Sequence, residues 1–221
     1  MRQHIAFLHT SPVHIATFER LVKDAAPTIT VEHIVLEKLL LEAQRLGPTE
    51  PSVVKRVHSA MHSAATNSPA LVICTCSTIG GAAERTPTEG RFIALRIDRA
   101  MADRAVSLGP RILVVAALES TLKPTIELLQ ESASMLQAEV ELQVVVAQDA
   151  WQHFIDGNHA AYIAAICQTV QAAASTDISA IVLAQASMAP AAEVLRGFGV
   201  EVLSSPQLGV QSLIARIYNA G

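Results

Sequence analysis

Short apolar runs rich in β-branched residues alternate along the chain with longer stretches whose apolar residues have helical spacing. This alternation predicts βα units built around parallel sheets. The expected strands are Ile5–Leu8, Thr28–His33, Ala70–Thr75, Phe92–Arg96, Arg111–Ala117, Val140–Val146, Ala180–Ala184 and Val200–Leu203. Helices are expected between them, among them Thr121–Gln137, Ala160–Ala173 and a last helix from Pro206 to Asn219.

The expected strands of the second half repeat those of the first half in the same order, after 107 to 112 residues. At an offset of 109, Cys76–Glu84 aligns with Gln185–Glu193, and both segments end in Ala-Ala-Glu. The repeat predicts an α/β fold with two pseudo-symmetric Rossmann-like lobes, each a mostly parallel sheet flanked by helices, and an active site in the cleft between them. We expect an N-terminal lobe over residues 1–98, with the C-terminal helix 206–221 packing back on it, and a C-terminal lobe over residues 99–205.

Composition narrows the class of protein. Of the 221 residues, 51% are hydrophobic and 16% are charged, which excludes a disordered chain. The net charge is −4 and the basic residues are scattered, so no nucleic-acid partner is expected. The longest apolar run, Ile112 to Leu118, is too short to span a membrane, and the N-terminus does not resemble a signal peptide. Together with three cysteines in no disulfide pattern, this predicts a cytoplasmic protein.

Ligands of parallel sheets bind beyond the carboxyl ends of the strands. The loops expected there are His9-Thr10-Ser11-Pro12, Cys76-Ser77-Thr78-Ile79-Gly80-Gly81, Leu118-Glu119-Ser120-Thr121 and Gln185-Ala186-Ser187. Their hydroxyl groups are helix caps by default and substrate ligands if several of them converge. Gly80-Gly81, with Ser77 and Thr78, is a candidate cradle for a carboxylate or phosphate.

Cys76 is the strongest candidate for a reactive group. It follows a predicted strand and begins the turn into a helix, where the helix dipole is expected to lower the pKa of its thiol and favour a thiolate base or nucleophile. The alternative is that Cys76 is a small buried apolar residue. Cys74 and Cys167 are interpreted as packing residues.

Three further groups are candidates for proton transfer. His9 could accept the proton of the Cys76 thiol, or simply bond to the backbone of its loop. Glu119 is a candidate general base whose alternative is an exposed surface carboxylate, and His153 lies in a long connection where lids form.

Asp98 and Arg99 are expected to pair between the lobes or to solvate the linker. His58 and His62 lie one helical turn apart without a convincing third ligand, so no metal site is expected and this helix face is interpreted as solvated.

The chain resembles the aspartate/glutamate racemase superfamily, which includes hydantoin racemases, maleate isomerases and arylmalonate decarboxylases. The matching segments are Leu71–Thr78, Arg111–Ala117 followed by Ser120-Thr121, and Ile181–Gln185. The resemblance implies a reaction without a cofactor, in which two cysteines, one per lobe, face opposite sides of a carbon next to a carboxylate. It gives Cys76 the first cysteine position, Ser77 and Thr78 the adjoining carboxylate-binding positions, and Ser120 and Thr121 their counterparts.

This sequence departs from the family pattern where the second cysteine is expected. Gln185 stands there, and its amide forms hydrogen bonds but cannot take a proton from carbon. His9 and Thr10 replace the usual aspartate or serine after the first strand, and Ser187 replaces a histidine that often follows the second cysteine. We therefore expect altered chemistry, with Thr10, Ser11, Gln185, Ala186 and Ser187 contributing to substrate binding.

Three functions follow as hypotheses. The first is a racemase or isomerase acting next to the carboxylate of a small amino acid or related acid, with Cys76 as one acid/base and Glu119 or His153 as the second. The next is a single-thiol enzyme, either a decarboxylase or a cis–trans isomerase. The last is a non-catalytic binding protein for a small carboxylate. The family often forms dimers, so a homodimer is a candidate assembly.

Overall fold

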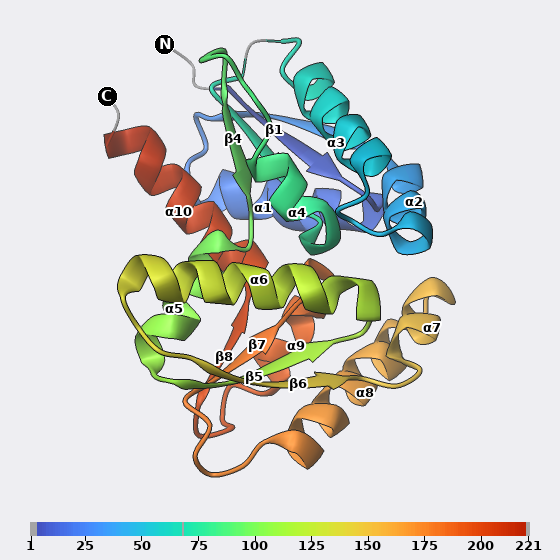
Figure 1. The fold of residues 1–221 in the computed structure, drawn as a ribbon, viewed down its shortest axis with the longest axis vertical. Helices are drawn as coiled ribbons and strands as arrows, with labels where there is room; N and C mark the ends of the chain where they lie inside the picture. The colour runs from blue at the N-terminus through green and yellow to red at the C-terminus, as the bar shows by residue number, and fades with distance from the viewer. Residues whose placement is uncertain (1–3, 68, 220–221) are drawn as a thin grey trace. The chain divides into compact units, whose positions relative to one another are not determined.

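The computed structural model describes residues 4–67 and 69–219. Its contacts divide the chain into two compact units. The first unit contains the residues up to Asp98 and those from Pro206 onwards, and the second contains Arg99–Ser205. Each is described separately below, with the labels of Figure 1.

The first unit is a parallel four-stranded sheet in the order β2-β1-β3-β4 with helices on both faces. Its elements in chain order are β1 (His4–His9), η1 (Pro12–His14), α1 (Ile15–Ala25), β2 (Thr30–Val35), α2 (Glu37–Leu46), α3 (Pro51–Ala64), β3 (Leu71–Cys74), α4 (Ser77–Glu84), β4 (Ile93–Arg96) and the last helix α10 (Ser205–Asn219). A Cβ added to Gly209 of α10 would lie 2.3 Å from the carbonyl oxygen of Ile97, so glycine allows this helix to approach the chain just after β4.

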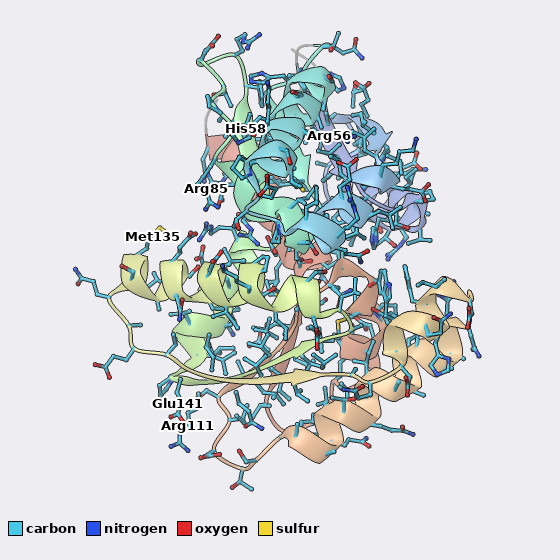
Figure 2. All side chains as sticks on the ribbon, turned by 45° about the vertical axis from the view of Figure 1, so that its right-hand side comes forward. Arg56, His58, Arg85, Arg111, Met135 and Glu141 are labelled. Atoms are coloured by element: carbon cyan, nitrogen blue, oxygen red, sulfur yellow. The ribbon has the colours of Figure 1, made fainter. Side chains whose placement is uncertain are left out.

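The second unit repeats this arrangement in a sheet with the order β6-β5-β7-β8. Its elements are α5 (Arg99–Leu108), β5 (Arg111–Ala116), α6 (Glu119–Leu136), β6 (Glu141–Val146), α7 (Ala150–Ile155), α8 (His159–Ala173), β7 (Ala180–Leu183), η2 (Ala186–Met188), α9 (Ala189–Val194) and β8 (Glu201–Ser204). Figure 1 shows α6 and α8 on opposite faces of this sheet. Figure 2 shows Arg111 and Glu141 at its edge, where the start of β5 pairs with the start of β6 through an ion pair.

The two sheets also share their strand register. Leu8 pairs with Cys74 across β1 and β3, and Val115 pairs with Leu183 across β5 and β7. The second pair lies 107 and 109 residues after the first, as the sequence repeat requires. The prediction of an α/β fold with two pseudo-symmetric parallel sheets is therefore confirmed.

Side-chain alternation decides what each sheet face presents. In the first unit, Leu8 and Cys74 pack with helices α2, α3 and α4 in one core. Their neighbours Phe7 and His9 point to the other face, because successive side chains of a strand alternate. In the second unit, Val115 and Leu183 pack with α8 and α9. Residues that follow these strands at intervals of two continue the same sheet faces beyond the carboxyl ends of the strands.

Two differences from the sequence-based predictions have a structural reason. β2 begins at Thr30 rather than Thr28, because the chain first makes a turn in which the Ile29 N–H donates to the Ala26 carbonyl. The connection expected around His153 is partly helical, as α7, with Trp151 stacked on Phe154 at a ring distance of 4.8 Å. Among the helices of the described residues, none combines the length and the apolar character needed to cross a bilayer.

Candidate functional site

Cys76 lies at the N-terminus of α4, two residues beyond the end of β3 and half-buried. Its sulfur is hydrogen-bonded by the Thr10 hydroxyl, by the backbone of Ile79 and Thr78, and by the Thr78 side chain. Burial nevertheless raises the pKa of the Cys76 thiol above its ordinary value, and these hydrogen bonds only oppose that rise. The expectation of a lowered pKa is wrong, because desolvation outweighs the helix N-terminus. The thiol is mainly protonated near neutral pH.

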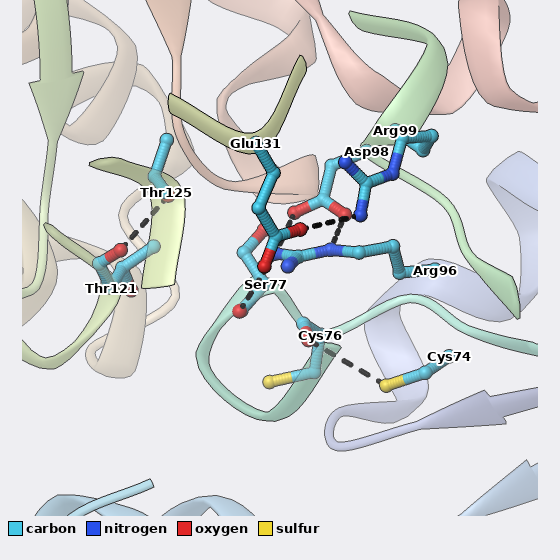
Figure 3. Close-up of polar contacts among 9 residues, drawn as sticks. All are labelled: Cys74, Cys76, Ser77, Arg96, Asp98, Arg99, Thr121, Thr125 and Glu131. Carbon is cyan, nitrogen blue, oxygen red and sulfur yellow. Dashed lines mark hydrogen bonds and ion pairs between the residues drawn. The ribbon is translucent and has the colours of Figure 1, made fainter. Parts of the chain in front are cut away.

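Cys74 lies deeper, within β3. Its Sγ donates to the Cys76 carbonyl at 3.6 Å, and burial raises the pKa of its thiol (Figure 3). Cys167 packs in α8, where burial also raises its pKa. Both therefore fit the packing role predicted from the sequence.

Next to the Cys76 loop lies a buried ion pair that the sequence did not reveal. Arg96 donates from Nε to Asp98 Oδ1 at 2.7 Å and from Nη2 to Asp98 Oδ2 at 3.0 Å (Figure 3), and both side chains are almost fully buried. Burial alone would raise the pKa of Asp98, but the charge and hydrogen bonds of Arg96 reverse this and lower it, with help from the Ser77 side chain. The same guanidinium reaches the Ser77 carbonyl at 3.5 Å. The ion pair therefore supports the start of α4.

The position of Arg96 corrects two expectations. Gly80 and Gly81 lie inside α4 rather than in an anion cradle, and a Cβ on Gly80 would be 3.0 Å from Arg96 Nε. Asp98 does not solvate the linker, because it is buried and pairs with Arg96, and Arg99 pairs with Glu131 of α6 at 2.8 Å within the second unit. Glycine at position 80 is explained by the room that the guanidinium needs.

His9 belongs to a histidine network on the other face of the first sheet. Its Nδ1 is 2.8 Å from Thr75 Oγ1, and its Nε2 is 2.8 Å from His33 Nδ1. Burial first, and then the neighbouring His33 and His14, lower the pKa of His9 to about 3. Both ring nitrogens are occupied, so His9 has no free nitrogen to accept the Cys76 proton. Alternation explains this, because Thr10, not His9, shares the parity of Cys76.

The hydroxyl residues predicted for the first unit gather mostly at the start of α4. Thr10, Ser77 and Thr78 are all less than 10% exposed. Ser11 precedes η1 and is half-buried, but its side chain makes no capping hydrogen bond. The default interpretation of Ser11 as a helix cap is therefore wrong. Of these residues, Thr10 and Thr78 place hydroxyl groups against the Cys76 sulfur.

In the second unit, Gln185 occupies the position equivalent to Cys76. Its Oε1 accepts a hydrogen bond from the Ala117 N–H at 2.6 Å, and the side chain is buried. Ala117 is the counterpart of Thr10, since each residue directly follows the central strand of its sheet. The contact between Thr10 and Cys76 is thus repeated as a contact between Ala117 and Gln185. Here the amide replaces a thiol and is fixed by the backbone.

The other predicted residues of the second unit differ in exposure. Ser120 and Thr121 lie in the first turn of α6, and the Ser120 Oγ is buried without a hydrogen-bond partner in the described part of the chain. The Thr121 carbonyl accepts from the Thr125 hydroxyl at 2.9 Å (Figure 3). Glu119 begins the same helix and is exposed. Ala186 is buried at the start of η2.

Ser187 has a partner that was missed in the sequence. Its Oγ is 2.8 Å from the hydroxyl of Tyr162, which lies on α8 and is 1% exposed. Tyr162, Ile166 and Val170 form one buried stripe of α8, and that spacing was the available signal that the phenol would be buried. A buried phenol needs a hydrogen-bond partner, but the sequence does not say which one.

No group of three or more potential ligand residues that could hold a metal occurs within residues 4–67 and 69–219. His62 packs edge-on against Phe92, and its Nδ1 is 3.3 Å from Arg91 Nη2. His58 has a buried Nε2 atom. Both residues are half-buried, so the interpretation of this helix face as simply solvated is incomplete.

No protein-family model and no curated protein sequence matches this chain. Solved structures do match it over nearly its whole length, and they share one fold, that of the glutamate, aspartate and allantoin racemases. At identities below 20%, these matches show the fold of the chain.

Three of the matching racemases represent the three substrates. A glutamate racemase from Bacillus anthracis is 15% identical, with a TM-score of 0.73 over 99% of this chain and 83% of that chain. An allantoin racemase from Klebsiella pneumoniae is 16% identical, with a TM-score of 0.65 over 99% of this chain and 89% of that chain. The aspartate racemase of Picrophilus torridus is 14% identical, with a TM-score of 0.63 over 97% and 94% of the two chains.

Proposed function

We propose that this chain is a cofactor-independent enzyme of the racemase and isomerase type that moves a proton at the carbon next to the carboxylate of a small acid or amino acid. Cys76 is its acid/base. The observation that carries the proposal is the surroundings of the Cys76 sulfur, which is hydrogen-bonded by Thr10 and by the first turn of α4 in a racemase fold. A thiol used only for packing needs no such donors.

The proposed proton transfer uses the same donors. When Cys76 takes a proton from carbon or loses one to it, the Thr10 and Thr78 hydrogen bonds stabilise the thiolate form, while burial favours the thiol. Developing negative charge on the substrate is stabilised by hydroxyl and N–H donors at the strand ends, including Ser77 and Thr78. Glu119 and His153 remain the candidates for a second acid/base.

A single-thiol reaction is the second candidate, and the fixed Gln185 amide favours it. Gln185 has its oxygen bound to the Ala117 N–H and cannot act as a base. In a decarboxylase, the C–C bond to the departing carboxylate would break, CO₂ would leave, and the electron pair would stay on the α-carbon as an enolate. The protonated Cys76 thiol would then donate its proton to that carbon and recover one from water. The raised pKa of Cys76 suits this role of proton donor.

The test is hydrogen exchange at the α-carbon. The full chain is incubated in deuterated water with a panel containing glutamate, aspartate, allantoin and 2-substituted carboxylic acids, and NMR follows loss of the α-hydrogen signal. The same samples, with 2-substituted malonates added, are assayed for release of CO₂. We expect one of the two signals, reduced at least about 100-fold in Cys76→Ser, in line with loss of a general acid/base.

Cys167→Ser is the matched control, because Cys167 is a buried thiol in a helix of the other unit. It should retain the signal of the unmodified chain. Full turnover by Cys76→Ser would overturn the proposal. So would the absence of both exchange and CO₂ release across the panel, which would favour a binding protein.

A further inference from the structure

Burial decides which of the two hydroxyl groups donates the hydrogen bond between Tyr162 and Ser187. Either hydroxyl could donate across the 2.8 Å contact. Tyr162 is 1% exposed, and no other residue in the described ranges accepts from its hydroxyl. If Ser187 donated, the phenol hydrogen would be buried without an acceptor, which costs about 1–3 kcal/mol. Tyr162 therefore donates, and the Ser187 hydrogen is left to point elsewhere.

The phenol also has a proton to donate. Burial raises the pKa of Tyr162 to about 12, although its hydrogen bond with Ser187 opposes that rise. The phenol therefore keeps its proton throughout the physiological range and stays a donor. Ser187 itself is half-buried, so its own hydrogen can reach a ligand.

Gln185 is oriented by an equally simple argument. A backbone N–H can only donate, so the Gln185 atom 2.6 Å from the Ala117 nitrogen has to be the amide oxygen. The NH₂ group is then turned away from Ala117, and no residue within the described part of the chain accepts from it. Two residues apart beyond β7, Gln185 and Ser187 each have their oxygen committed to a protein donor and a hydrogen left to give.

We propose that Tyr162 fixes Ser187 as a hydrogen-bond donor, so that Ser187 and the Gln185 amide form a subsite for a carboxylate group of the substrate. Carboxylate oxygens accept hydrogen bonds only, which matches two donors that have no acceptor in the described part of the chain. An ammonium group can only donate and is disfavoured there. The inference rests on the proposed function and deepens it: the strand end that would hold a second thiol binds charge instead of moving a proton. Tyr162 is a positioning residue, acting through Ser187.

The experiment measures binding of a simple dicarboxylate, separately from turnover. Succinate is titrated into the full chain by calorimetry, with neutral succinamide as the uncharged comparison. We expect succinate to bind and succinamide to bind at least about fivefold more weakly, since hydrogen bonds to a charged group are the stronger ones. Ser187→Ala and Tyr162→Phe should each weaken succinate binding about 3- to 10-fold, the usual range for one hydrogen bond.

Three controls separate positioning from general damage. Tyr218→Phe alters the other tyrosine of the chain, which is 61% exposed on α10, and should leave the affinity unchanged. Ser187→Thr keeps a hydroxyl and should bind within about twofold of the unmodified chain. The double variant Tyr162→Phe/Ser187→Ala should be no weaker than Ser187→Ala alone, because Tyr162 acts through Ser187.

Unchanged succinate affinity in either Ser187→Ala or Tyr162→Phe would overturn the inference, as would equal binding of succinate and succinamide or no succinate binding by the unmodified chain. Additive losses in the double variant would also contradict it. Binding of succinate is measured separately from turnover. Succinate binding without any exchange or CO₂ release would therefore defeat the proposed function and leave the subsite standing, and the reverse pattern would defeat only the subsite.

Discussion

At the residue scale, hydrogen bonds from neutral groups and burial have opposite effects on the ionisation of one thiol. Thr10 and Thr78 favour the thiolate of Cys76, burial favours the thiol, and burial is the larger effect. The equivalent position in the second unit has no ionisable group, because Gln185 is held by the Ala117 N–H. Two residues in matching places of a repeated fold therefore have opposite chemical abilities: one can exchange a proton, and the other can only bind.

Removing the Thr10 hydrogen bond should make the Cys76 thiol harder to ionise. We expect Thr10→Val to shift the pH midpoint of Cys76 alkylation by iodoacetamide upward and to slow alkylation at fixed pH about 3- to 10-fold, because the thiolate is the reactive form. Peptide mapping by mass spectrometry measures the rate at Cys76 alone. Thr169→Val, which removes a hydroxyl bonded to the Ala165 carbonyl of α8, is the control and should change nothing. Faster alkylation of Thr10→Val would contradict this account.

At the element scale, α4 is placed by an arginine rather than by loop flexibility. The Arg96 guanidinium is buried, bound at two atoms to Asp98, and packed against the Gly80 position of the helix. It thereby fixes the turn that carries Cys76, Ser77 and Thr78. A glycine pair after a strand is an ambiguous pattern, since it serves equally to bind a phosphate and to admit a large neighbouring side chain. Which one applies depends on Arg96, a distant partner in the sequence.

The two glycines of α4 should respond differently to alanine. In Gly80→Ala the new Cβ meets the fixed Arg96 guanidinium at 3.0 Å, and we expect a loss of about 1–3 kcal/mol in the free energy of unfolding. In Gly81→Ala it meets the end of the exposed Arg85 side chain, which can move, so the higher helix propensity of alanine should leave stability unchanged or raise it by up to about 1 kcal/mol. Urea unfolding followed by circular dichroism measures both. Equal effects would show that Arg96 does not constrain the helix.

At the scale of the whole molecule, much of the fold could be predicted because its signals are local and repeated. The apolar runs located the strands of both sheets to within one or two residues, and the repeat offset aligned Cys76 with Gln185 correctly. The site was less predictable, because it depends on pairs far apart in the sequence. Arg96 beneath α4 and Tyr162 beside Ser187 leave no sequence pattern at either partner. The separation of His9 from Cys76, by contrast, followed from strand parity and could have been predicted.

The histidine network makes the stability of the molecule sensitive to acid. Burial is the main cause that lowers the pKa of His9 to about 3 and that of His14 to about 4, against 6.5 for an ordinary histidine. Between pH 6.5 and these lowered pKa values, the unfolded chain binds protons that the folded chain does not bind. The contribution of these histidines to stability is therefore fully present above about pH 6.5 and falls as the pH drops toward 4. Thermal unfolding across this range should show a falling Tm.

A variant separates this effect from general acid denaturation. His14→Phe removes one half-buried titrating ring and should make the fall in Tm between pH 6.5 and 4 shallower. His159→Gln, at an exposed histidine at the start of α8, should follow the unmodified chain. A Tm that is flat over this range, or identical slopes in all three proteins, would contradict a buried neutral network.

The central claim is that one thiol, and not a pair, carries out the chemistry. The most direct test supplies the separate enantiomers of the acid that exchanges fastest and follows deuterium uptake at its α-carbon by NMR, with the unmodified chain and with Cys76→Ser. We predict uptake with the unmodified chain and uptake from neither enantiomer with Cys76→Ser. Uptake from either enantiomer that survives Cys76→Ser would contradict it.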